Sequence, residues 1–110
     1  MAKDDYFPIA YRILAYLYAC MKAGQTPEPE YLTYEALGIN ESYWAAIMTE
    51  LHNNGYIRGS GFAPLLGGRL PVRIDSLQIT QQGIEFMQEN SAMNKAKAFL
   101  KELKEIIPGI

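Results

Sequence analysis

Apolar residues recur at helical spacing along the first part of the chain. The pattern predicts a helix from about Tyr6 to Lys22, with Asp5 as its N-cap and Gly24 as its stop. Its main apolar face consists of Tyr6, Ile9, Ala10, Ile13, Leu17, Cys20 and Met21. A second stripe on another side consists of Tyr11, Ala15, Tyr18 and Ala19. Because one small core covers only one face of a helix, we expect another element to cover the second stripe.

The next apolar pattern predicts a helix-turn-helix unit. A short helix is followed by a tight turn, and Asn40 is the expected N-cap of the second helix. Ile39 before the cap and Trp44 inside the helix form a hydrophobic staple. The buried stripe of the second helix consists of Trp44, Ile47, Met48 and Leu51. Its outward face, which a partner would meet, consists of Ser42, Ala46, Thr49, Glu50 and Asn53.

Two short runs after this unit predict antiparallel strands, Tyr56–Arg58 and Ser76–Ile79. The glycines and prolines between them predict a loop too long for a tight hairpin, which we interpret as a wing. Thr80 is the expected N-cap of another short helix, and Gly83 beside it permits close packing or a turn. The order of elements predicts a single domain over residues 1–110 that is mostly α with a small β-hairpin (α+β). The expected fold is a winged helix-turn-helix with an additional C-terminal helix.

Residues 91–107 predict that C-terminal helix, which carries a heptad-like apolar seam. The seam consists of Met93, Ala96, Leu100, Leu103 and Ile107. One interpretation is that the seam packs on the second apolar stripe of the first helix, and the other is that it forms a homodimer. The candidate interaction surface therefore consists of Tyr11, Tyr18, Leu100 and Leu103.

Four stretches of the chain together resemble the YjcQ family: Tyr34–Glu41, Gly55–Ile57, Ile79–Gly83 and Leu100–Gly109. The resemblance covers nearly the whole chain. It implies a small winged-helix protein of the kind found in Gram-positive bacteria and their phages and prophages, and hence an origin in a mobile element. It implies no catalytic site.

The overall charge of the chain gives no sign of a nucleic-acid partner. Ten basic and twelve acidic residues give a formal net charge of −2, whereas a positive excess usually accompanies nucleic-acid binding. Cys20 is the single cysteine, which excludes an internal disulfide and predicts a reduced, cytoplasmic protein. The apolar run of the first helix is shorter than a membrane span and contains Arg12, so we expect no membrane segment.

The sequence contains no motif for catalysis or cofactor binding. His52 is the only histidine and has no cysteine near it in the sequence, so a transition-metal site lacks ligands. Phosphate-binding glycine motifs and a nucleophile elbow are absent. We therefore expect no enzyme, no cofactor, no metal and no small-molecule substrate.

Local charge decides how DNA could be bound. Residues 28–55 contain five glutamates and no lysine or arginine, which is the wrong sign for approaching phosphates. The wing region carries Arg58, Arg69 and Arg73 and has no acid before Asp75. We expect a DNA-binding accessory or transcription-regulatory factor that contacts double-stranded DNA weakly through these arginines. The residues of the outward helix face that could meet bases are Ser42, Thr49 and Asn53.

The alternative is a protein-protein interaction module that uses the winged-helix fold without binding DNA. The acidic helix-turn-helix face, exposed tyrosines of the first helix and the terminal helix would then contact a protein partner or a second copy of the chain. The usual role of the fold favours DNA binding, and the charge map favours the alternative.

Overall fold

The computed structural model describes residues 6–59 and 73–103, and the side chains of the last helix as far as residue 98. In chain order the elements are α1 (Tyr6–Ala23), η1 (Pro29–Tyr31), α2 (Tyr34–Leu37), α3 (Glu41–Asn53), β1 (Ile57–Arg58), η2 (Ile74–Ser76), β2 (Gln78–Ile79), α4 (Gln81–Glu89) and α5 (Ser91–Leu103). The described part is mostly helical with a small two-stranded antiparallel sheet, which confirms the predicted α+β class. None of the helices in these two ranges has the length and apolarity that a membrane span requires. The expected N-cap Asp5 and most of the expected wing, Arg69 included, lie outside the described residues.

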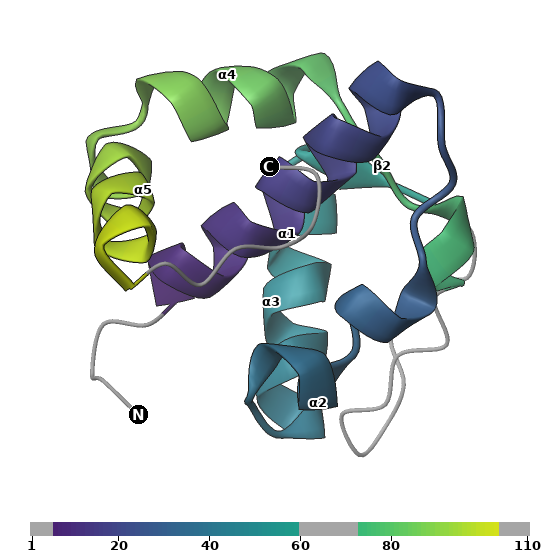
Figure 1. Ribbon diagram of the computed structural model, residues 1–110. Helices are drawn as coiled ribbons and strands as arrows, with labels where there is room; N and C mark the ends of the chain where they lie inside the picture. The colour runs from purple at the N-terminus through teal and green to yellow at the C-terminus, as the bar shows by residue number, and fades with distance from the viewer. Residues whose placement is uncertain (1–5, 60–72, 104–110) are drawn as a thin grey trace.

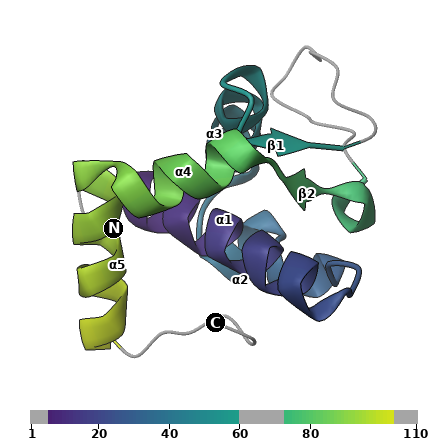
Figure 2. The ribbon, with the colours of Figure 1, turned by 90° about the horizontal axis from the view of Figure 1, so that it is seen from above.

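Helix α1 forms the centre of the core (Figure 1, Figure 2). It contacts α3, α4, α5 and β2, so both of its apolar stripes are covered and Ala15 of the second stripe is buried. Tyr11 and Tyr18 are half-buried and pack against the core, so the expectation that the tyrosines of this helix are exposed is wrong. Met21 was expected in the core, but its side chain is 46% exposed because it lies in the last turn of α1, where a cleft opens.

The turn between α2 and α3 has the structure that the sequence predicts. Gly38 has a φ of +73°, which favours glycine, and the Tyr43 N–H donates to Asn40 Oδ1 at 2.8 Å. Trp44 is buried, and its Nε1–H donates to the Leu32 carbonyl oxygen at 2.8 Å. The predicted buried stripe of α3 is confirmed. The Trp44 bond and this stripe fix which face of α3 points outward.

The two strands pair antiparallel in a register that separates an apolar face from a polar one. Ile57 lies opposite Ile79, and both are buried. Arg58 lies opposite Gln78, and both are exposed. Since residues directly opposite each other share a face of the ribbon, Arg58 and Gln78 stand together on its solvent side.

Strand β2 is shorter than predicted because the residues before it form the turn η2. The Ser76 N–H donates to the Arg73 carbonyl oxygen at 3.0 Å, and the Leu77 N–H donates to the Ile74 carbonyl oxygen at 3.1 Å. The Ser76 hydroxyl also donates to the Arg73 carbonyl oxygen, at 2.6 Å. These donors therefore close a local 3₁₀ turn instead of a ladder.

Helix α4 begins at the predicted cap. The Gly83 N–H donates to Thr80 Oγ1 at 3.0 Å, and the Thr80 hydroxyl donates to the Gly55 carbonyl oxygen. Gly83 packs so closely on the Tyr56 carbonyl that a Cβ would overlap it. Of the two roles that the sequence allowed for Gly83, the structure therefore shows close packing.

Helix α5 packs against α1 and α4 of the same chain. Asn90 Oδ1 caps it by accepting from the Ala92 and Met93 N–H groups at 2.9 and 3.2 Å. Met93 and Ala96, the first two residues of the predicted seam, are buried. The described half of the seam is thus covered within one chain. The side chains of Leu100 and Leu103 and all of Ile107 lie outside the described part.

Candidate nucleic-acid interface

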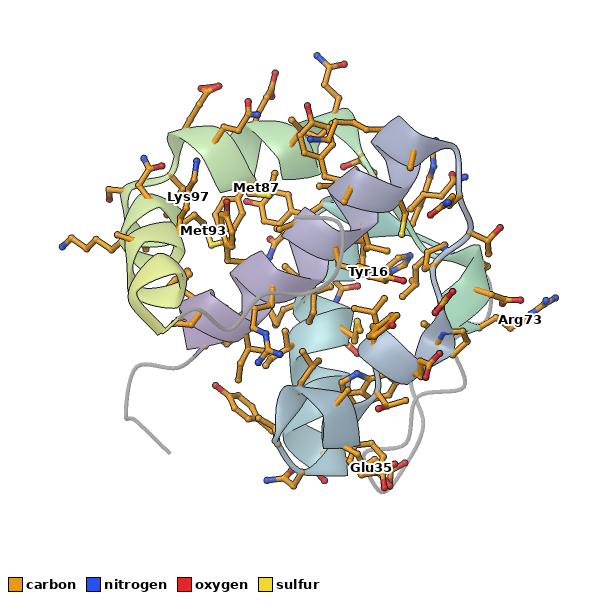
Figure 3. The ribbon with its side chains drawn as sticks, viewed as in Figure 1. Tyr16, Glu35, Arg73, Met87, Met93 and Lys97 are labelled. Atoms are coloured by element: carbon orange, nitrogen blue, oxygen red, sulfur yellow. The ribbon has the colours of Figure 1, made fainter. Side chains whose placement is uncertain are left out.

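The outward face of α3 carries negative charge. Ser42 and Asn53 are exposed as predicted, whereas Thr49 is half-buried. Glu41 and Glu50 are exposed on the same helix. Glu35 of α2 is exposed nearby, at the lower end of Figure 3. The polar side chains that could read bases therefore stand among carboxylates, which repel phosphates.

The C-terminal end of α3 lies close to the first turn of α1. Burial raises the pKa of the Tyr6 phenol, and the neighbouring Glu50 carboxylate and Tyr56 phenol raise it further. A phosphate approaching this end of α3 would meet the Glu50 charge beside the Tyr6 and Tyr56 phenols.

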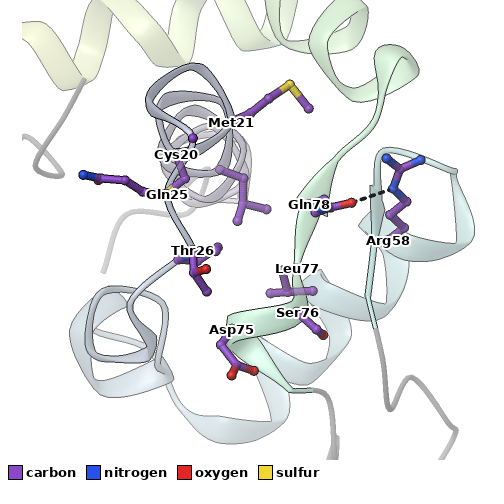
Figure 4. A pocket seen from close by; sticks show the side chains of 12 residues that line it. Cys20, Met21, Gln25, Thr26, Arg58, Asp75, Ser76, Leu77 and Gln78 are labelled. Atoms are coloured by element: carbon purple, nitrogen blue, oxygen red, sulfur yellow. Dashed lines mark hydrogen bonds between the residues drawn. The ribbon is translucent and has the colours of Figure 1, made fainter.

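Arg58 and Gln78 form a cross-strand pair at the sheet. The Arg58 Nε–H donates to Gln78 Oε1 at 3.0 Å, as Figure 4 shows. Because the partner is a neutral amide, the bond orients the guanidinium without neutralising its charge. Arg58 was predicted from the sequence as a site residue, whereas Gln78 was not. The sequence carried only a partial signal, because pairing Ile57 with Ile79 places Arg58 opposite Gln78, whereas pairing Ile57 with the equally apolar Leu77 would not.

Arg73 lies beside the sheet and points away from the protein (Figure 3). Its Nη2 donates to Asp75 Oδ2 at 3.1 Å, with the two side chains 70% and 43% exposed. An ion pair this exposed contributes only about 0–1 kcal/mol to stability. It nevertheless places a carboxylate against the guanidinium, so the positive charge expected of Arg73 at the wing is partly offset by the acid that ends the acid-free stretch. The cause is the η2 turn, which brings the two side chains together.

A cleft of about 400 Å³ opens between the end of α1 and the η2–β2 segment. Figure 4 shows it. Its lining consists of Leu17, Cys20, Met21, Gly24, Gln25, Thr26, Pro27, Arg58, Asp75, Ser76, Leu77 and Gln78. The cleft mixes apolar side chains from α1 with polar side chains from the sheet. Arg58 and Gln78 are therefore reachable from solvent at its edge.

Other candidate chemistry does not gather into a site in the described part. Cys20 is buried, and His52 lies in the last turn of α3. Within residues 6–59 and 73–103, no three His, Cys, Asp or Glu side chains lie close enough together to hold a metal ion.

Comparison with known proteins identifies a family that the chain matches. The family model described as YjcQ protein matches residues 11–106. No match was found among curated proteins or among solved structures.

Proposed function

The chain belongs to the YjcQ family, and we propose that it is a winged-helix DNA-binding protein of phage or prophage origin, acting as an accessory or transcription-regulatory factor. The order α1, α2, α3, β1, β2 and α4 supports a winged-helix interpretation. In this proposal the β1–β2 end contacts the DNA backbone, and α3 does not enter the major groove.

The observation that carries this proposal is the exposed and oriented guanidinium of Arg58, which forms no ion pair with an acid in the described part of the chain. Neutralisation of phosphates supplies most non-specific DNA affinity, so a cation on the outer face of the sheet is the group that DNA would meet first. The carboxylates on α3 oppose a closer approach. We therefore expect weak binding that is sensitive to salt and only slightly dependent on sequence.

The test is a titration of a short labelled duplex at salt concentrations from about 50 to about 200 mM. Because the described residues at the sheet include only two arginines, Arg58 and Arg73, the slope of log K against log salt should lie between about −1 and −3, since each neutralised phosphate contributes about −0.9. Arg58→Gln should make the slope shallower by about 0.9.

Lys97→Gln is the matched control. Lys97 is exposed on α5, and Figure 2 shows α5 and the sheet on opposite sides of α1. This control should leave the slope unchanged. A steep slope that survives Arg58→Gln, or one that depends on Lys97, would refute the proposed contact surface.

The second candidate is a protein-interaction module that does not bind DNA. The observation that favours it is the exposure of Glu35, Glu41 and Glu50, in a stretch of chain without lysine or arginine. This surface would suit a basic partner. The double variant Glu41→Gln/Glu50→Gln separates the two functions. If α3 faces the duplex from a distance, the double variant should bind DNA more tightly than the wild type at low salt, because it carries two fewer negative charges. If neither the wild type nor the double variant binds DNA, the result supports the second candidate.

A further inference from the structure

We propose that Gln78 is a positioning residue for Arg58, which it holds ready to donate both Nη groups to one DNA phosphate. The proposal rests on the proposed DNA-binding function and adds a residue and a geometry to it. Gln78 itself need not touch DNA.

The core holds the backbone beneath the Arg58–Gln78 pair in place. Ile57 and Ile79 are the neighbours of Arg58 and Gln78 in the ladder, and they are 2% and 0% exposed. The Thr80 N–H donates to the Tyr56 carbonyl oxygen at 3.0 Å, which continues the pairing towards α4. The two polar side chains therefore start from Cα positions that the core fixes.

The hydrogen bond to Gln78 leaves the two Nη groups of Arg58 available for a phosphate. Arg58 uses its Nε–H for Gln78 Oε1. Arginine has five N–H donors, so the two Nη groups keep four N–H donors in a planar fork. That fork matches two oxygens of a phosphate, which is the strong bidentate geometry for arginine. Gln78 Oε1 therefore binds the Arg58 Nε–H, which a phosphate bound to both Nη groups does not need.

Arg73 and Arg58 differ in the charge of the group that each one contacts. The partner of Arg73 is the Asp75 carboxylate, which orients the guanidinium but offsets its charge. The partner of Arg58 is an amide, which orients the guanidinium and leaves its charge intact. Ordering a long side chain on binding lowers affinity, and a side chain already ordered in the free protein avoids that loss. Among the described arginines at the sheet, Arg58 alone combines order with an un-neutralised charge.

The experiment measures duplex affinity and its salt slope for the full chain and for Gln78 variants. Gln78→Ala should lower affinity by about two- to tenfold, the cost of ordering one long side chain at binding. It should leave the salt slope unchanged, because no charge changes. Gln78→Glu keeps an acceptor but adds a negative charge, so it should lower affinity and also make the slope shallower. Gln88→Ala, at an exposed glutamine of α4, is the matched control and should change neither quantity.

A double-mutant cycle tests whether Gln78 acts through Arg58. Lysine keeps the charge but lacks the planar fork. In an Arg58→Lys background, Gln78→Ala should therefore cost less affinity than it costs in the wild type. In the free protein, the Nε–H signal of Arg58 in a ¹⁵N–¹H spectrum should exchange with water faster in Gln78→Ala than in the wild type. This measurement needs no DNA and also shows whether the variant is folded.

The outcomes distinguish this inference from the proposed function. If the wild type does not bind the duplex at low salt, the proposed function fails and this inference fails with it. If the wild type binds and Arg58→Gln weakens binding, but Gln78→Ala binds as the wild type does, then only the positioning role is overturned. Equal costs of Gln78→Ala in the wild-type and Arg58→Lys backgrounds would overturn it as well.

Discussion

Replacing Gly83 by alanine should destabilise the protein, although alanine is the better helix former. Gly83 lies in the first turn of α4 and is not among the described glycines with positive φ, so helix propensity alone would favour alanine by up to about 1 kcal/mol. The added Cβ would overlap the Tyr56 carbonyl oxygen and lie 2.8 Å from Ile79 Cγ1. The carbonyl is not free to move, because it accepts the Thr80 N–H at 3.0 Å.

The expected loss follows from these opposing effects. Overpacking a well-filled site costs about 1–3 kcal/mol, and an obstacle made of backbone places this site at the upper end. After the gain in helix propensity, the free energy of unfolding should fall by about 1–2 kcal/mol. Each kcal/mol should lower Tm by about 4–8 °C in a domain of this size.

Thermal and urea unfolding followed by circular dichroism measure this change. Gln88→Ala introduces alanine at an exposed position of the same helix and should stay within about 0.5 kcal/mol of the wild type. A Gly83→Ala protein at least as stable as the wild type would refute the close packing of α4 on the end of β1.

Three further predictions concern the core. Trp44→Phe leaves the buried Leu32 carbonyl oxygen without its donor and should cost about 1–3 kcal/mol, while Trp44→Ala should cost about 3–5 kcal/mol, both measured by urea unfolding. Burial raises the pKa of the Tyr16 phenol above its ordinary value of 10.0, so its contribution to stability is full below pH 10 and is lost as the pH rises through the raised pKa. Tyr16→Phe removes the acceptor of the Glu28 N–H, so it should be less stable than the wild type at pH 7 but lose less stability above pH 10, measured as Tm against pH. Ala96→Asp places a carboxylate in the buried contact of α5 and should lower Tm by more than 10 °C, on the order of 3 kcal/mol.

Controls and contrary outcomes for these predictions use neighbouring exposed positions. Lys97→Asp sits one residue from Ala96 on the exposed side of α5 and should leave Tm nearly unchanged. Equal effects of the two aspartates would mean that α5 is not packed as described. A Trp44→Ala protein with near-native stability would contradict the burial of α3. An alkaline Tm profile that is the same in Tyr16→Phe and in the wild type would show that Tyr16 does not titrate as its burial requires.

The candidate site could be predicted in part. The sequence identifies Arg58 as a cation near the strands, but the alternation of apolar and polar residues allows Ile57 to pair with either Leu77 or Ile79. Only the register in the structure places Arg58 opposite Gln78.

The local structure around Arg73 could not be predicted from the sequence. Arg73 and Asp75 would lie on the same face of a strand, and they can also meet in a turn, so their spacing does not distinguish the two structures. The hydrogen bonds of η2 decide which local structure forms.

Features that depend on a few neighbouring residues follow from the sequence alone. Asn40 and Thr80 are caps because an oxygen acceptor stands immediately before an apolar helical pattern, and Gly24 and Gly38 end helices because they adopt positive φ. Features that depend on residues distant in the chain required the three-dimensional arrangement. Met21 is exposed although it shares a helix face with core residues, whereas Tyr11 and Tyr18 are half-buried. Periodicity gives the faces of a helix, but burial depends on which other elements pack against each face, and this is set by the whole arrangement of α3, α4, α5 and β2 around α1.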